Sequence, residues 1–140
     1  MKKVARGILL CMGLLGFSIA VHFFVHDGIP LPDTPKTENV EQVIVVHHDY
    51  PNDTKEYSDE FHIKIAVALI GYLDHNPLKK LSKELPEASP VIQITYSMKD
   101  GTEVVILAND DTVWWKDKTY AIHNEGEFVK MCTATFYLQN

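Results

Sequence analysis

Residues 91–123 read VIQITYSMKDGTEVVILANDDTVWWKDKTYAIH, and this stretch decides the fold. Over residues 91–98 apolar and polar side chains alternate, which is typical of a strand with one buried face. The apolar side chains on that face are Ile92, Ile94, Tyr96 and Met98. Asp100-Gly101 is a strong hairpin signal, and turn-forming residues recur at 109–111 and 117–118. Further strands are predicted at residues 103–107, 112–116 and 119–123. The stretch therefore predicts a four-stranded antiparallel meander.

Two strands are predicted upstream of the meander. Residues 40–48 (VEQVIVVHH) are rich in β-branched side chains and are followed by a cluster of turn-forming residues at 49–53. Residues 54–57 then return as a short second strand. Residues 78–90 are predicted to be a connection between the two halves of the domain.

Two helices are also predicted. The first begins at Ser58-Asp59, which resembles an N-cap, and runs to about His75, before Asn76-Pro77. Its expected apolar stripe is Phe61, Ile65, Leu69 and Tyr72, widened by Ile63, Val67 and Ile70. The second opens at Asn124, which forms a capping box with Glu127. Its expected buried side is Phe128, Met131, Cys132, Thr135 and Phe136. The order β-β-α-β-β-β-β-α predicts an α+β domain with both helices on one face of an antiparallel sheet.

The N-terminal segment has the pattern of a membrane anchor. Residues 1–6 (MKKVAR) carry three positive charges, and residues 7–25 contain no Asp, Glu, Lys or Arg. A helix of that length spans about 28 Å, close to the hydrocarbon thickness of a bilayer. The positive flank is expected to stay in the cytoplasm, which places everything after His26 outside. The main alternative is a signal peptide cut after Ala20, which would release a secreted protein. A lipoprotein site at Cys11 is disfavoured, because the bulky Leu10 precedes it and it lies too early in the chain.

These patterns divide the chain into a cytoplasmic start (1–6), a transmembrane anchor (7–25), a Pro-rich stalk (26–39) and an extracytoplasmic domain (40–140). All acidic residues but only ten of the basic ones follow His26, so the outer part has a net charge of −9. Such a surface argues against nucleic acid and anionic lipid as partners. The two cysteines, Cys11 and Cys132, are too far apart in this plan for a disulfide.

The sequence contains no complete catalytic or metal motif. His47-His48-Asp49 offers metal-binding side chains, but alternation along a strand lets only His47 and Asp49 share a face. Further ligands would have to come from the distant His62, His75 or His123. No His-Glu-x-x-His and no Gly-x-Ser-x-Gly sequence is present. We therefore expect no cofactor, no metal and no catalytic residue.

The pair Trp114-Trp115 is the strongest candidate for binding. Alternation along a strand sends one indole into the core and the other to the opposite face. Trp115 shares its face with Val113, whereas Trp114 shares its face with Thr112 and Lys116. An exposed Trp114 beside Tyr120 or Tyr96 would form a platform for a peptide, a glycan or a partner protein. The alternative is that helices cover both faces and both indoles are core.

Several segments together resemble a known class of domain. They are residues 29–32 (IPLP), 55–59 (KEYSD), 92–96 (IQITY), 100–103 (DGTE) and 112–115 (TVWW). This set resembles small extracytoplasmic domains of Gram-positive bacteria. Some of these are C-terminal tails of membrane-bound antirepressor metalloproteases similar to the β-lactam sensor, and others stand alone behind one membrane segment. The resemblance covers nearly all of residues 29–138, and the zinc motif of the proteases is absent from this chain.

Taken together, these features predict a membrane-anchored extracytoplasmic binding or regulatory domain without catalytic activity. Its partners would be the membrane and a membrane or cell-envelope protein. The alternative function is an exported metal-binding protein or small hydrolytic enzyme that uses surface histidines such as His47.

Overall fold

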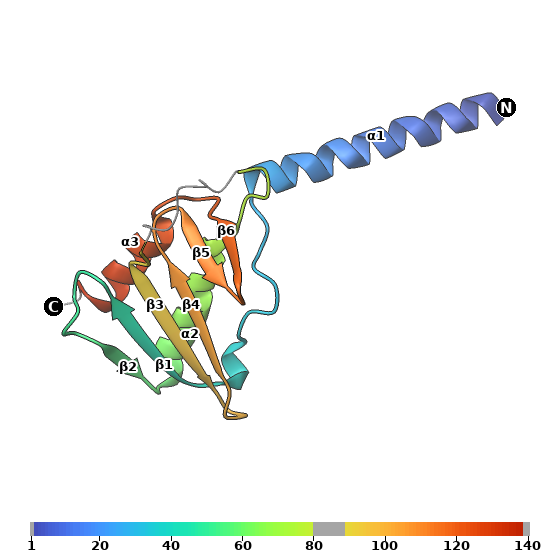
Figure 1. Cartoon of the computed structure of the whole chain (residues 1–140). Helices are drawn as coiled ribbons and strands as arrows, with labels where there is room; N and C mark the ends of the chain where they lie inside the picture. Colours follow the sequence, from blue (N-terminus) through green and yellow to red (C-terminus); the bar gives the residue numbers. More distant parts are fainter. Residues whose placement is uncertain (1, 80–88, 139–140) are drawn as a thin grey trace.

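The computed structural model describes residues 2–79 and 89–138, and the side chains of residues 20, 21 and 23–26 are outside this description. The described chain is an α+β protein with one antiparallel sheet, which confirms the predicted class (Figure 1). The helices are α1 (Lys2–His26), α2 (Glu60–Ala68) and α3 (Glu127–Phe136), with short 3-10 helices η1 (Thr37–Asn39) and η2 (Leu69–Leu73). The strands are β1 (Val40–His47), β2 (Lys55–Tyr57), β3 (Ile92–Met98), β4 (Glu103–Ala108), β5 (Thr112–Trp115) and β6 (Lys118–Ala121). Most of the predicted connection at 78–90 lies outside the described residues.

The sheet has the strand order β2-β1-β3-β4-β5-β6, and neighbouring strands are antiparallel. The predicted meander of β3 to β6 is confirmed. The sequence did not indicate that β1 pairs with β3, which joins the two halves of the domain through partners such as Val43 with Tyr96 and Val45 with Ile94. These residues are fully buried, so the long-range pairing brings two apolar strand faces onto one core.

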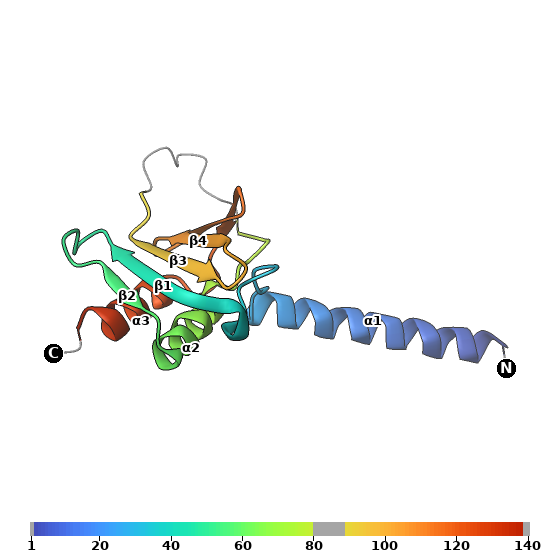
Figure 2. The same ribbon diagram turned by 90° about the horizontal axis from the view of Figure 1, so that it is seen from below.

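Both domain helices lie on one face of the sheet, as Figure 2 shows from below. The core lies between them and the sheet, and its largest fully buried side chains include Trp115, Tyr96, Phe128 and Leu73. The Tyr96 hydroxyl donates a hydrogen bond of 2.8 Å to the carbonyl oxygen of Ala66 in α2. This bond satisfies the one polar atom of a buried side chain and fixes the position of α2 on β3.

The helix predicted from Ser58-Asp59 to about His75 is α2 followed by η2, and its buried face agrees only in part with the predicted stripe. The predicted Ile63, Leu69 and Ile70 are buried, as are Ala66 and Leu73, whereas the predicted Phe61 is 68% exposed and Tyr72 is 37% exposed. Asp59 is the N-cap, as predicted, and its side chain accepts a hydrogen bond from the His62 amide. The helix centres its buried face on the small Ala66, because Tyr96 approaches the backbone there. The helical spacing of the apolar residues predicted a buried Phe61 and did not single out Ala66.

The start of α3 corrects a second prediction. The helix begins at Glu127 with Gly126 as its N-cap, and no side-chain hydrogen bond caps it, so Asn124 and Glu127 do not form a capping box. Gly126 has a φ of 77°, and its amide donates to the carbonyl oxygen of Asp110. The tight turn before the helix uses Gly126, because glycine adopts this left-handed conformation without strain. Phe128, Cys132 and Phe136 are buried as predicted.

The segment predicted to be a stalk packs against the domain. Leu31 is buried, and the Trp115 indole donates a hydrogen bond of 2.8 Å to the carbonyl oxygen of Pro32. Ile29 and His75 form an isolated antiparallel bridge. The packed domain therefore begins at about residue 28, not at residue 40.

Helix α1 extends away from the sheet (Figure 1). Its large apolar side chains with a described position are between 51% and 74% exposed. They are Val4, Ile8, Leu9, Leu10, Met12, Leu14, Leu15, Phe17 and Ile19. The sequence predicts a transmembrane helix over residues 7–25, but among the residues that the structure describes no helix is both long enough and apolar enough to cross a membrane.

Candidate binding surface

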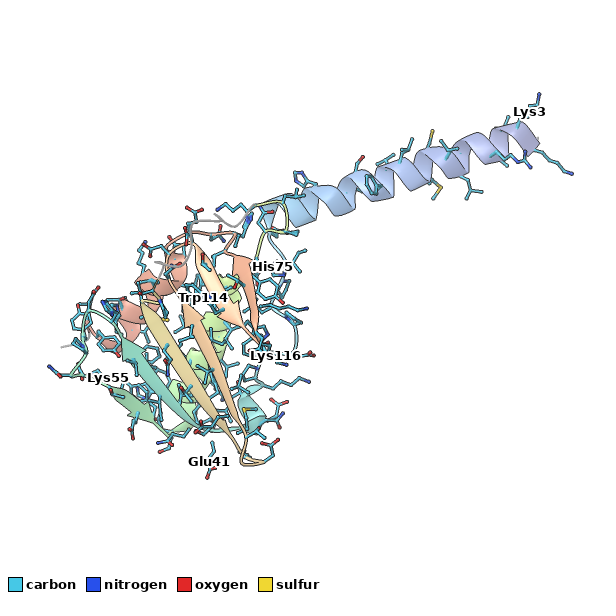
Figure 3. The ribbon with its side chains drawn as sticks, in the orientation of Figure 1. Lys3, Glu41, Lys55, His75, Trp114 and Lys116 are labelled. Carbon is cyan, nitrogen blue, oxygen red and sulfur yellow. The ribbon has the colours of Figure 1, made fainter. Side chains whose placement is uncertain are left out.

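The two adjacent tryptophans point to opposite faces of β5. Trp115 is 1% exposed and belongs to the core beneath the helices. Trp114 is partly exposed on the face opposite the helices, where Figure 3 labels it. The alternation of a strand causes this separation. The prediction that Trp115 is the core indole is confirmed.

Tyr120 and Tyr96 do not share the face of Trp114. Tyr120 pairs with Val113, packs against the core, and places its ring 4.6 Å from the ring of His75. Tyr96 is fully buried. The structure therefore does not bring Trp114 and Tyr120 together, and the aromatic platform suggested by the sequence is not assembled.

A different set of side chains surrounds Trp114. Strand pairing places Leu107 and Thr119 on either side of it, and Gln93 and Val46 continue the same row across β3 and β1. A second row on the same face contains Ile44, Thr95 and Val105. We call these side chains and Trp114 the open face; they are Ile44, Val46, Gln93, Thr95, Val105, Leu107, Trp114 and Thr119, and among them Thr95 is buried. The sequence did not single out Leu107 or Val105, because the register between strands decides which residues meet.

The open face ends in an open hollow of about 500 Å³ beside the β5-β6 turn. Val105, which is 40% exposed, Leu107 and Trp114 form its apolar wall. The charged residues Glu103, Lys116, Asp117 and Lys118 also line it. Accessible apolar side chains beside charges of both signs are the composition of a protein-binding surface.

The β5-β6 turn beside the hollow contacts the segment at residues 32–33. Lys116 and Asp117 have positive φ values of 46° and 61°, as a two-residue turn between twisted strands requires. The Lys116 ammonium lies 5.2 Å from the ring centre of Trp115 and 3.8 Å from a carboxylate oxygen of Asp33. Residues 32–33 therefore contact both Trp115 and the turn that shapes the hollow.

His47 is a structural residue in this fold. It is buried, and its Nδ1 accepts a hydrogen bond of 3.1 Å from the Asp49 amide. Nε2 therefore carries the proton of the neutral ring and donates to the Thr133 hydroxyl at 2.9 Å. Thr133 in turn donates to the carbonyl oxygen of Val129. Both ring nitrogens are used, so His47 has no nitrogen left for a metal.

The histidines of the alternative hypothesis lie in separate places. His62 is bound to Asp59 at the start of α2, and His75 and His123 flank Asp74 near the end of α1. Within residues 2–79 and 89–138, no group of three His, Cys, Asp or Glu side chains is arranged to hold a metal ion. Asp100 accepts hydrogen bonds from the amide and hydroxyl of Thr102, which lower its pKa and stabilise the β3-β4 turn.

We expect the stability of the domain to fall in acid because of His47. Burial lowers the pKa of His47 below its ordinary value of 6.5, so the unfolded chain binds a proton more readily than the folded one. The stabilisation is complete above pH 6.5 and is lost as the pH falls from there through the lower folded-state pKa. Urea unfolding as a function of pH measures this effect.

The matched control for this prediction is His47→Gln, which does not titrate. The free energy of unfolding should fall less steeply below pH 6.5 in the variant than in the natural protein. Parallel curves for the two proteins would show that the ionisation of His47 is not coupled to folding.

Comparisons with protein families, with curated proteins and with solved structures found no match to this chain. The resemblance to extracytoplasmic domains of Gram-positive bacteria therefore stays a prediction.

Proposed function

We propose that this chain is a membrane-anchored extracytoplasmic protein whose domain binds a membrane or envelope protein and catalyses no reaction. The observation that carries the proposal is the open face, where Val105 is exposed and Leu107 and Trp114 are partly exposed. Helices α2 and α3 lie on the other side of the sheet (Figure 2). Trp is enriched at protein interfaces, because it combines a large apolar area with one hydrogen-bond donor.

The anchor is proposed from the sequence of residues 7–25, part of which lies outside the described side chains. The exposed apolar side chains of α1 support this anchor. Side chains such as Leu9, Leu10 and Phe17 are more than two-thirds exposed. A helix with apolar side chains on every side needs an apolar environment, and a bilayer supplies one. The three positive charges in residues 1–6 favour a cytoplasmic N-terminus.

A protein partner suits the open face better than a small molecule does. The hollow is open to solvent and has an apolar wall, whereas small-molecule sites enclose most of the ligand. The part of the chain after His26 has a net charge of −9, which disfavours nucleic acid as a partner. The metal-binding or hydrolytic alternative gains no support, since the histidines it needs are dispersed.

Site-specific photocrosslinking in the host membrane tests the proposal. A photoreactive phenylalanine at Val105 should give a discrete crosslinked product, because Val105 is the most exposed apolar residue of the open face. The same residue at Glu60, which is exposed on α2, is the matched control. Trp114→Ala should remove the product at Val105 without changing the amount of protein.

Two outcomes would refute the binding proposal. Either equal products at Val105 and Glu60 or a product at Val105 that persists in Trp114→Ala would show that the open face is not the interface. Fractionation of the same cells tests the anchor separately, because a soluble product that begins at Val21 would indicate cleavage after Ala20 and secretion.

A further inference from the structure

The connection between α1 and the domain is unusually short. α1 ends at His26, and Gly28 already packs against the domain. A Cβ atom added to Gly28 would lie 3.0 Å from the Cβ of His123 and 3.1 Å from the Cβ of Asp74. Gly28 also has a φ of 74°, a conformation that disfavours other residues. The backbone therefore enters a space between Asp74 and His123 that only glycine fits without displacement.

The next residue is fixed by backbone hydrogen bonds. The Ile29 amide donates to the carbonyl oxygen of His75, and the His75 amide donates to that of Ile29, both at 2.8 Å. His75 also forms a bridge with Ile122, directly after β6. Ile29 and His75 thus extend the pairing pattern of the sheet beyond β6. We call Gly28, Ile29, Asp74, His75, Ile122 and His123 the clasp.

Further backbone hydrogen bonds connect residues 74–76 with residues 121–123. The His123 amide donates to the carbonyl oxygen of Asp74 at 2.8 Å, and the Asn76 amide donates to that of Ala121 at 2.9 Å. Lys79 forms an ion pair with Glu125 beside them. The clasp therefore belongs to the hydrogen-bonded framework of the domain and is not a loose contact of a linker.

This geometry limits how far the domain can move from the end of α1. Only Asp27 separates His26 from Gly28, and two peptide units span at most about 8 Å. A flexible stalk over residues 26–39 would allow free rotation, but residues 28–32 are bound to the domain. The edge of the domain that contains the clasp must therefore stay close to the C-terminal end of α1.

We propose that the domain lies directly on the membrane surface, with the clasp edge against the lipid head groups. The inference rests on the proposed membrane anchor and adds a fixed orientation to it. The β1-β2 turn is at the opposite side of the domain from α1 in both ribbon views, and therefore points away from the bilayer (Figures 1 and 2). The open face then stands beside the membrane, where it is accessible to a neighbouring membrane protein.

The short connection through Asp27, which we call the tether, brings this edge to the membrane, and charge attraction does not. The exposed groups near the clasp include Asp27, Asp110, Asp111 and Glu125, and Lys79 is already paired with Glu125. Among the described residues of this edge, acidic groups outnumber basic ones, which does not favour binding to anionic lipid. Contact with zwitterionic head groups is therefore expected only while α1 is attached through Asp27.

Fluorescence quenching by lipid head groups tests this orientation. The full chain with Cys11→Ser is reconstituted into phosphatidylcholine vesicles that contain a head-group spin label. One variant adds Asn124→Cys, beside the clasp, and the matched variant adds Asn52→Cys, in the β1-β2 turn. Cys132 is fully buried and does not react with the fluorophore. We expect strong quenching at position 124 and several-fold weaker quenching at position 52.

A second variant tests the role of the tether. A flexible Gly-Ser linker inserted between Asp27 and Gly28 keeps the anchor and the clasp, but releases the domain from the surface. Quenching at position 124 should then fall to the level at position 52. Unchanged quenching after insertion, or equal quenching at the two positions without it, would overturn the orientation. Vesicle flotation reports the anchor separately, since a chain that fails to float would refute the membrane anchor itself.

Discussion

Trp115→Ala should lower the free energy of unfolding by about 3–5 kcal/mol, the usual range for the loss of a buried large aromatic side chain. The Trp115 side chain is 1% exposed, and its indole is hydrogen-bonded to Pro32. Its removal leaves a cavity and frees the carbonyl oxygen of Pro32. The loss is a large part of the total stability of an ordinary domain, which is about 5–15 kcal/mol. Chemical denaturation of the natural protein and the variant measures it.

Trp114→Ala is the matched control, because it removes the same side chain from the next position of the same strand. Trp114 lies on the open face, so its loss should cost only about 1 kcal/mol. Equal and severe destabilisation by both substitutions would mean that both indoles are core. That outcome would also remove the basis for binding at the open face.

Tyr96→Ala is expected to have the second largest effect, again about 3–5 kcal/mol. Tyr96 is fully buried, and its hydroxyl holds α2 through the carbonyl oxygen of Ala66. Tyr96→Phe keeps the ring and removes only this hydrogen bond, so it should cost about 1 kcal/mol. The difference between the two variants separates packing from hydrogen bonding.

Tyr72→Phe is the control for the hydroxyl, because Tyr72 lies in η2 and is 37% exposed. Its stability should match that of the natural protein in the same denaturation experiment. A Tyr96→Phe variant as stable as the natural protein would show that the bond to Ala66 does not position α2.

The binding proposal and the orientation proposal are linked by the segment at residues 29–33. This segment begins in the clasp, contacts Trp115 through Pro32, and reaches the turn beside the hollow through Asp33. The end of α1 and the open face are therefore connected by a few consecutive residues. Trp115→Ala should loosen this connection and increase amide hydrogen exchange at Ile29 as well as lower global stability.

The sequence by itself determined the local elements of this protein. Alternation over residues 92–98 correctly predicted that Ile92, Ile94 and Tyr96 are buried, and Asp100-Gly101 predicted the turn after the strand. Asp59 marked the start of α2, and the alternation at Trp114-Trp115 correctly assigned Trp115 to the core. These features depend on neighbouring residues in the chain, so the period of the backbone is enough to predict them.

Only the tertiary structure decided which distant segments meet. The register between β5 and β6 places Tyr120 opposite Val113 on the core face and gives Trp114 the neighbours Leu107 and Thr119. The approach of Tyr96 to Ala66 sets the buried face of α2, and the space between Asp74 and His123 receives Gly28. No local pattern specifies these contacts, because each depends on the relative position of segments that are far apart in the chain. A Pro-rich stretch reads as an extended linker in the sequence, and it becomes part of the domain only because the folded core presents an indole donor to Pro32 and a backbone partner to Ile29.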